Sequence, residues 1–287
     1  MNELEWPFRA NEALAAGLVS RYQLRTQYRA VHRNVYVPKG QRLTPVTRAV
    51  SAWLWSDRQA TVAGLSAAAL YRTKWIDDWL PAELNRSGRD KADGILLHSG
   101  TLDDDETCIR GGMSLTSPAR TAFDLGRRTG LQTAVIRLDA LARATDLKTA
   151  DVECLVERHR GARGIVQLRR ALELVDGGSQ SPWETRTRLT LIAAGLPRPA
   201  TQVPVYDADC LIARIDLGWD EWLVGVEFDG AHHWTDPAQR TWDIDRLAEL
   251  EALGWRIVRV SADMLRYRPA VVVARVLAAL RAAGAPV

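Results

Sequence analysis

The sequence contains little cysteine, and its cysteines form no recognisable framework. Cys108, Cys154 and Cys210 are the three cysteines among 287 residues. Their number is odd and no two have C-x-x-C spacing, so the sequence indicates neither a disulfide framework nor a zinc site. We expect all three to be small residues of the core.

Long apolar segments are absent too. No run approaches the roughly 18 to 20 apolar residues that a helix needs to cross a bilayer. Residues 1–6 lack the basic and then apolar order of a signal peptide. With 47% hydrophobic residues over 287 positions, the chain is typical of a globular protein long enough for two domains. We expect a cytoplasmic protein with no membrane partner.

Lysine is missing from the C-terminal part of the chain. Residues 181–287 contain 12 arginines, no lysine and 14 acidic residues, a balance of about −2, and because the whole chain carries +3, residues 1–180 carry about +5. Neither part is strongly basic. A nucleic-acid partner would therefore need a local arginine patch in each part, with a metal ion offsetting the acidic residues after 180.

A domain boundary is predicted near residue 180, where Gly, Ser and Pro residues interrupt a helical pattern. Ser181 as N-cap, Pro182 at the first helical position and Glu184 form a predicted capping box for a helix over 182–195. After this helix the spacing of the apolar residues changes, and the new spacing predicts further strands and helices. They are strands at 202–206, 211–217 and 222–228, a helix at 236–253, a strand at 255–260 and a helix at 270–283.

The N-terminal part, residues 1–180, is predicted to be mostly helical with small β pieces. The pattern of its first elements, over about residues 8–40, suits a small winged helix. The expected helices lie at 11–17, 20–30, 45–55 and 66–71, with a further one beginning at Pro118, and the expected strands lie at 32–38, 94–98 and 113–116.

Acidic side chains lie within the apolar strands of the C-terminal part. Asp216 is in the second predicted strand, and Glu227 and Asp229 share one face of the third because residues two apart in a strand point the same way. A carboxylate among Val, Ile and Phe is costly unless a cation or hydrogen-bond donors offset it. Mg²⁺ prefers oxygen ligands, so we predict a Mg²⁺ (or Mn²⁺) site at these three residues.

Such a site is suited to phosphodiester hydrolysis. A divalent metal polarises a phosphoryl oxygen, lowers the pKa of the attacking water and stabilises the leaving oxygen. His233, or its neighbour His232, is suited to general acid or base catalysis near neutral pH.

Structural explanations of these residues stay open. Glu184 is also explained as the acid of the capping box, and Asp216 as the partner of Arg214 in an ion pair on an edge strand. A purely structural role for the two acids of the third strand, and packing of the histidines beside Trp234, are further alternatives.

The C-terminal pattern resembles the very-short-patch-repair-like branch of the PD-(D/E)xK nucleases over about residues 181–280. The likeness rests on Asp216, Val-Glu-Phe-Asp-Gly-Ala-His-His at 226–233, Asp-Ile-Asp-Arg at 243–246 and Leu-Gly-Trp-Arg-Ile-Val-Arg-Val at 253–260. It implies a restriction-endonuclease-like core, a mixed sheet flanked by helices, with a Mg²⁺ site. The implied catalytic residues are Glu184, Asp216, Glu227, Asp229 and His233, with Arg246 as the residue that binds phosphate.

One departure from this family matters. The family lysine would stand two residues after Glu227, where this sequence has Asp229. Without that cation to orient water, catalysis would depend on the metal and on His233 or Arg246.

The N-terminal part resembles, more weakly, the AbiEi-type antitoxin and transcriptional-regulator family. The likeness rests on His-Arg-Asn-Val-Tyr-Val-Pro at 32–38, Leu-Ser-Ala-Ala-Ala-Leu at 65–70 and Leu-Thr-Ser-Pro-Ala-Arg-Thr-Ala-Phe-Asp-Leu at 115–125; ordinary helix caps and core packing explain them equally well. It implies a winged helix whose Arg25, Arg29 and Arg33 contact a phosphate backbone.

Together these patterns predict an α/β (α+β) protein that is a Mg²⁺-dependent DNA endonuclease with an N-terminal DNA-positioning region. The alternative is a catalytically inactive DNA-binding regulator or antitoxin of a toxin–antitoxin or abortive-infection system. DNA is the expected partner, and a toxin or a second copy of the chain is a further candidate.

Overall fold

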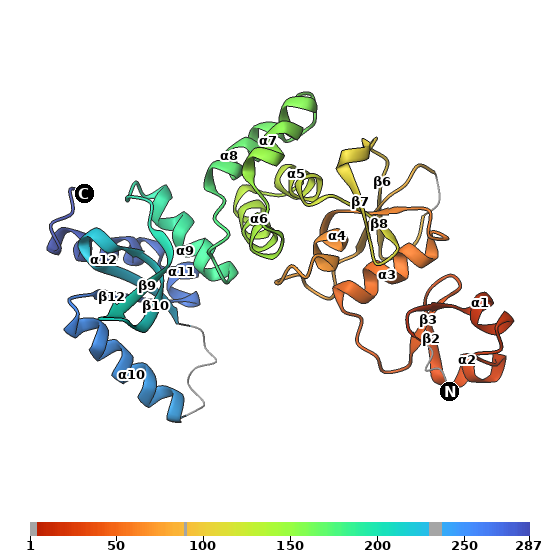
Figure 1. Ribbon diagram of the computed structural model, residues 1–287, viewed down its shortest axis with the longest axis horizontal. Coiled ribbons are helices and arrows are strands. Elements are labelled where there is room, and N and C mark those ends of the chain that lie inside the picture. Colours follow the sequence, from red (N-terminus) through yellow and green to blue (C-terminus); the bar gives the residue numbers. More distant parts are fainter. Residues whose placement is uncertain (1–4, 89–90, 230–236) are drawn as a thin grey trace. The chain divides into compact units, whose positions relative to one another are not determined.

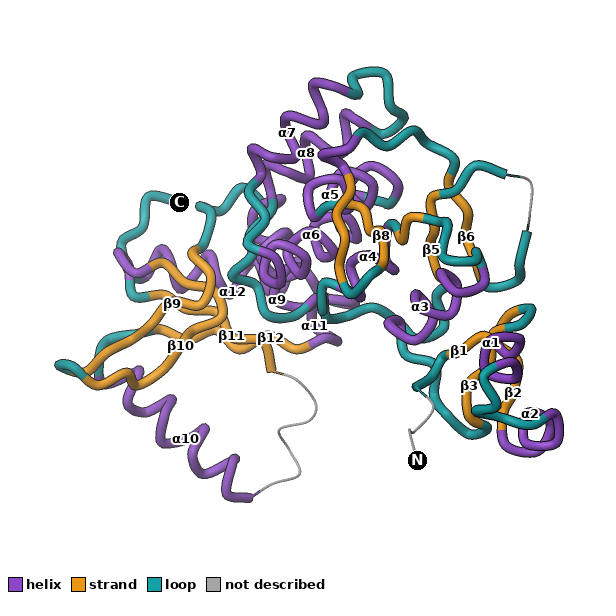
Figure 2. The backbone as a smooth tube through the Cα atoms, turned by 45° about the vertical axis from the view of Figure 1, so that its right-hand side comes forward, coloured by secondary structure: helices purple, strands orange, loops and turns teal. Residues whose placement is uncertain are grey.

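The computed structural model describes residues 5–88, 91–229 and 237–287, without the side chains of 237–244 (Figures 1 and 2). The chain forms two compact units. The first contains Met1–Thr129 and Ala144–Leu172, and the second contains Gly130–Arg143 and Glu173–Val287. Among the described residues, no helix has the length and apolar character needed to cross a membrane.

The first unit begins with a small three-stranded antiparallel sheet and two helices. In chain order these are β1 (Phe8–Arg9), α1 (Ala10–Ala15), α2 (Arg21–Gln27), β2 (Tyr28–His32) and β3 (Val35–Pro38), with sheet order β1-β3-β2. A capping box between Ser20 and Gln23 starts α2. The prediction of a helix through residue 30 was wrong, because Tyr28 leaves the helical conformation and pairs with Pro38.

The rest of the first unit is a five-stranded mixed sheet with helices. Its sheet has the order β6-β5-β4-β8-β7, in which β4–β8 and β5–β6 are parallel pairs. The elements are α3 (Pro45–Trp55), β4 (Thr61–Val62), α4 (Gly64–Leu70), β5 (Ala82–Asn85), β6 (Ile95–His98), β7 (Thr107–Arg110), β8 (Met113–Thr116), α5 (Pro118–Arg128), α7 (Thr149–Arg158) and α8 (Ile165–Leu174). The helices at α3 and α5 were predicted, whereas β4, β5 and β7 were not.

The second unit holds a four-stranded mixed sheet. The strands have the order β12-β11-β10-β9, antiparallel from β9 to β11 and parallel between β11 and β12. Its elements are α6 (Leu131–Thr145), α9 (Pro182–Ala193), β9 (Ala200–Asp207), β10 (Cys210–Trp219), β11 (Val224–Asp229), α10 (Pro237–Ala252), β12 (Arg256–Ser261), α11 (Ala262–Tyr267) and α12 (Pro269–Ala282). The fold class is therefore mixed α/β, as predicted.

Helices cover both faces of this sheet (Figure 1). One core cluster joins Leu191 of α9 and Val276 of α12 to Val226 and Val260 of the strands. A second cluster packs Leu250 of α10 against the opposite face, with Val203, Val205, Ala213, Ile215 and Trp255. This three-layer arrangement holds the ends of β10 and β11 at fixed positions next to α9.

A close packing contact in β11 requires glycine. A Cβ at Gly225 would lie 2.7 Å from Cδ1 of Ile257 and 2.8 Å from Cγ2 of Ile215, closer than real Cβ atoms come. Gly225 thus lets β11 pack beneath two branched side chains, two residues before Glu227.

The cysteine prediction was wrong for two of the three residues. Cys154 and Cys210 are exposed, and Cys108 is half-buried with its sulfur 3.0 Å from the Tyr71 hydroxyl. Cys154 lies on an exposed position of α7 and Cys210 begins β10 beside the β9–β10 turn, so neither element buries its cysteine.

Candidate functional site

Three carboxylates from three different elements approach one another in the second unit. Glu184 lies in the first turn of α9, Asp216 in β10 and Glu227 in β11. Gln202 of β9 lies between the first two: its Nε2 donates to Oε2 of Glu184 at 3.2 Å and to Oδ1 of Asp216 at 3.5 Å. The sheet and the start of α9 therefore bring together Glu184, Asp216 and Glu227, three of the residues that the sequence singled out.

Gln202 has an unusual backbone conformation at this point. Its φ is +53°, in the left-handed region that a residue inside a strand rarely adopts. The neighbouring pairs Val203–Ile215 and Thr201–Leu217 set Gln202 opposite Asp216 in the sheet. Local strain of this kind persists where the surrounding structure enforces it, and it clusters at functional sites.

Asp216 has a strongly shifted pKa. Burial is the largest cause, the negative charge of Glu184 is the second, and Glu227 adds to it, so the pKa rises to about 7. The backbone N–H of Phe228 donates to Oδ2 of Asp216 at 2.8 Å and opposes the rise. Asp216 forms no ion pair with Arg214 among the described residues, so the edge-strand ion pair considered from the sequence is absent.

Glu184 has only part of its predicted role in the helix cap. Ser181 Oγ accepts the N–H of Glu184 at 3.2 Å, as an N-cap does. The Glu184 carboxylate reaches past the cap residue and accepts the N–H of Gln180 at 2.7 Å. Burial raises the pKa of Glu184, against hydrogen bonds that lower it. The reciprocal capping box is thus incomplete, and one carboxylate oxygen, Oε1, has no donor among the described residues.

Each of the other two predicted acids is paired with an arginine. Arg246 of α10 donates to both oxygens of Glu227, at 2.5 and 2.8 Å, and Arg259 of β12 donates to Oδ2 of Asp229 at 2.8 Å. A metal ligated by Glu227 would have to compete with a bidentate guanidinium. Arg259 is a residue that the sequence reasoning missed. It donates to Asp229, which stands where the nuclease family that the sequence resembles has a lysine.

The metal site predicted at Asp216, Glu227 and Asp229 is not a closed cluster in this structure. Among residues 5–88, 91–229 and 237–287, the set whose ligand atoms all lie within 4.8 Å of one another is Asp103, Glu106 and His159, in the first unit. Glu106 is fully buried and forms ion pairs with Arg120 and His159, while Arg158 forms an ion pair with Asp103. Charges in that set are already balanced by arginines, so it needs no cation.

His233 and Asp243 were also named from the sequence. His233 lies outside the described residues, as does the side chain of Asp243. Their roles stay predictions.

The three arginines predicted to contact DNA lie on different elements of the first unit. Arg25 is exposed on α2, and Arg29 of β2 is half-buried and donates to the carbonyl of Gln41 at 2.9 Å. Arg33 is exposed in the turn between β2 and β3, where Asn34 has φ +64°. The structure therefore does not gather the three on a single helix face.

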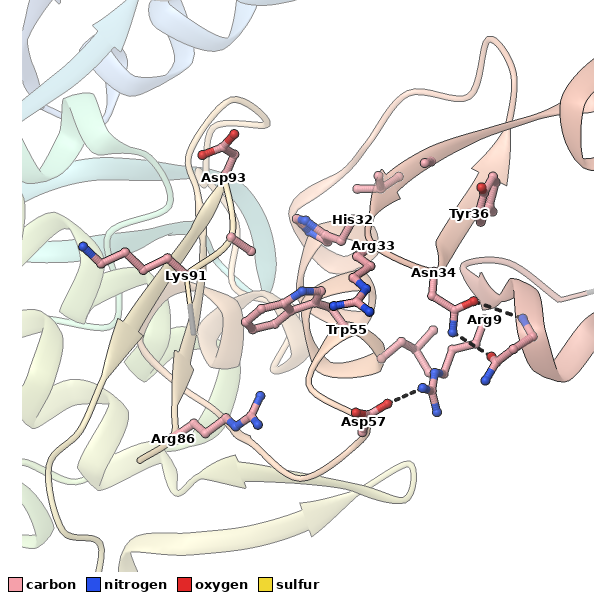
Figure 3. A pocket seen from close by; sticks show the side chains of 15 residues that line it. Arg9, His32, Arg33, Asn34, Tyr36, Trp55, Asp57, Arg86, Lys91 and Asp93 are labelled. Atoms are coloured by element: carbon pink, nitrogen blue, oxygen red, sulfur yellow. Dashed lines mark hydrogen bonds and ion pairs between the residues drawn. The ribbon is translucent and has the colours of Figure 1, made fainter. Parts of the chain in front are cut away.

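Arg33 lines a hollow of about 990 Å³ in the first unit (Figure 3). Its other basic residues are Arg9, Arg86 and Lys91, against the acids Asp57 and Asp93. The guanidinium of Arg86 lies 5.9 Å from the centre of the Trp55 ring. Figure 3 shows Arg9 already paired with Asp57. The hollow has a net positive lining with the aromatic rings of Tyr36 and Trp55, which suits an anionic group.

The chain is similar to two proteins of Mycobacterium tuberculosis. One is an uncharacterized protein of strain CDC 1551 / Oshkosh and the other an uncharacterized protein of strain ATCC 25618 / H37Rv. Each is 33% identical over 165 residues, which is 58% of this chain and 61% of the relative, so the match spans less than two thirds of their length. No family model matches the chain, and no solved structure matches it significantly.

Proposed function

We propose that the second unit is a Mg²⁺- or Mn²⁺-dependent endonuclease that hydrolyses phosphodiester bonds of DNA, with the core of the very-short-patch-repair-like PD-(D/E)xK nucleases. The observation that carries the proposal is the convergence of Glu184, Asp216 and Glu227. Burial, with the charges of Glu184 and Glu227 as further causes, raises the pKa of Asp216 to about 7. A buried carboxyl group beside other carboxylates favours a nearby cation, and such shifts cluster at functional sites.

The chemistry of the donor set fits a hard divalent cation. Asp216 and Glu184 offer carboxylate oxygens, and Oδ1 of Asp216 and Oε2 of Glu184 share the amide donor of Gln202. When bound, the metal would polarise the phosphoryl group and lower the pKa of the attacking water. Gln202 and the Phe228 N–H orient the carboxylates, while Arg246 and Arg259 hold Glu227 and Asp229.

For the first unit we propose a DNA-positioning role based on a winged helix at about residues 8–40, as the AbiEi resemblance implies. The order of two helices followed by a β-hairpin supports it. Tyr22, Arg21 and Arg25 are exposed on α2. Positive charge on an exposed helix and in the hollow beside Arg33 would give salt-dependent affinity for phosphate groups.

One observation favours the alternative, a DNA-binding regulator or antitoxin that has lost catalysis. Both Glu227 and Asp229 are paired with arginines, and Asp229 stands where the nuclease family has lysine. A protein of this kind would bind DNA equally well with and without a divalent metal.

The direct test is cleavage of a panel of labelled DNAs by the purified protein. The panel should include duplex, mismatched, branched and single-stranded substrates, each with Mg²⁺, Mn²⁺ or EDTA. Endonuclease activity predicts products with either metal and none with EDTA. DNA binding without products under every condition would reject the nuclease and favour the regulator.

Metal affinity should depend on pH because the carboxyl of Asp216 must lose its proton to bind a cation. Its pKa of about 7 lies above the ordinary value, so the group is mostly protonated below pH 7 and ionised above it. We expect Mn²⁺ affinity to rise about tenfold for each pH unit between pH 5 and 7 and to level off near pH 8. Electron paramagnetic resonance of free Mn²⁺ across this range measures it. Equal Mn²⁺ affinity at pH 5.5 and pH 8 would contradict the prediction. In Asp216→Asn, the part of the pH dependence that comes from the Asp216 carboxyl should disappear.

A further inference from the structure

Two arginines beside the carboxylate cluster share one tryptophan ring. The guanidinium carbon of Arg186 in α9 lies 4.7 Å from the centre of the Trp183 ring, and that of Arg266 in α11 lies 5.8 Å from it. Trp183 also stacks on Phe228, with ring centres 5.5 Å apart and planes 2° from parallel. Tyr267, which is 69% exposed, lies next to Arg266.

These two cations differ from the other arginines near the site. Arg246 and Arg259 each donate to a carboxylate. By contrast, neither the guanidinium of Arg186 nor that of Arg266 has an ion pair or hydrogen bond within 5–88, 91–229 and 237–287, and Nε of Arg186 is buried without an acceptor. A guanidinium stacked on a ring keeps its N–H edges free, in a geometry that matches phosphate oxygens. Two like charges on one ring, with no ionic partner in the described part of the chain, favour an anion between or beside them.

The position of the ring connects this pair to the carboxylates. Trp183 immediately precedes Glu184, and Phe228 lies between Glu227 and Asp229 with its N–H on Asp216. The two stacked rings are therefore adjacent in sequence to the carboxylate cluster: Trp183 to Glu184 on α9, and Phe228 to Glu227 on β11. Three carboxylates repel a nucleic-acid backbone, so a strand that reaches them needs cations that are not already neutralised.

We propose that Arg186 and Arg266, held on Trp183, form a binding site for a backbone phosphate of the nucleic-acid strand at the carboxylate cluster. The inference rests on the proposed function for the identity of the anion as part of a strand. Trp183 and Phe228 fix the arginines, and the exposed ring of Tyr267 offers a surface for a sugar or base of the same strand.

Binding measured without cleavage tests this site. Fluorescence anisotropy of labelled duplex and single-stranded DNA, with Ca²⁺ or EDTA in place of Mg²⁺, is compared across a salt series for wild type, Arg186→Gln and Arg266→Gln. Each substitution is expected to weaken binding about tenfold and to lower the slope of log affinity against log salt by about one, because one phosphate contact is lost. Arg186→Lys keeps the charge and should retain most of the slope.

The matched control is Arg281→Gln, which removes one exposed positive charge at the end of α12 in the same unit. Affinity and slope equal to this control in both variants would overturn the proposal. Inorganic phosphate should compete only at millimolar concentration, and competition at micromolar concentration would reject a strand as the ligand.

Cleavage on the same preparations separates this inference from the proposed function. Cleavage by the wild type with unchanged binding of both variants removes the phosphate site but leaves the nuclease. Lost binding in the variants, with no cleavage by the wild type, leaves the phosphate site but removes the nuclease.

Discussion

Replacing Asp216 with alanine is expected to abolish metal-dependent DNA cleavage. Asp216 is the carboxylate that interacts electrostatically with both Glu184 and Glu227 and that accepts the N–H of Phe228, so its removal takes away the central oxygen ligand of the proposed metal site. Charge stabilisation by a bound metal contributes several kcal/mol to the transition state, which corresponds to a loss of about 1,000-fold or more in rate. Single-turnover cleavage with Mn²⁺ measures it.

Asp216→Asn and Asp220→Ala serve as the comparison variants. An asparagine oxygen can still accept the Phe228 N–H, so Asp216→Asn should fold as the wild type does and still lose activity. Asp220, just after β10, is exposed and lies outside the cluster, so Asp220→Ala should cleave normally. Cleavage retained within a few-fold by Asp216→Ala, with normal circular dichroism, would show that metal chemistry is located elsewhere.

Elements with a strong local signal could be predicted from the sequence. The Ser-Pro pair at 181–182 and the change to period-two alternation after 200 placed α9 and β9 within two residues of their observed ends. Local signal was misleading where pairing decided the conformation. Residues 28–30 fit a continuing helix, yet they form part of β2 because residues 36–38 of β3 supply an antiparallel partner. Short strands such as β4, with 2 residues, have no period to detect.

The residues of the candidate site also divide into those that the sequence predicts and those that it does not. Asp216 and Glu227 could be predicted because charged residues inside apolar strands need compensation. Gln202 and Arg259 could not, because their roles depend on which strands pair. Asp216 lies opposite Gln202 through the β9–β10 register, and Arg259 lies beside Glu227 through the parallel β11–β12 register. An alternating strand pattern predicts which face a residue occupies but not its neighbour across the sheet.

Breaking the buried ion pair between Asp139 and Arg188 should destabilise the second unit more than a substitution on its surface. Asp139 of α6 and Arg188 of α9 are 1% and 0% exposed, and Arg188 Nη2 donates to Asp139 Oδ2 at 2.7 Å. Thr185 and the N–H of Asp176 also donate to this carboxylate, each at 2.8 Å. Asp139→Ala leaves a buried guanidinium without its carboxylate, and we expect the free energy of unfolding to fall by about 3–5 kcal/mol. Urea denaturation followed by circular dichroism measures this.

Loss of the Asp139–Arg188 pair should also loosen α9, the helix that positions Glu184, because Arg188 and Thr185 lie in that helix. Hydrogen exchange of the α9 amides should therefore accelerate in Asp139→Ala. The double replacement Asp139→Leu with Arg188→Met removes both charges and should recover much of the stability, since apolar residues of similar size often replace a buried pair without cost. A loss below about 1 kcal/mol in Asp139→Ala would mean that water reaches Arg188 and that the pair does not anchor α9.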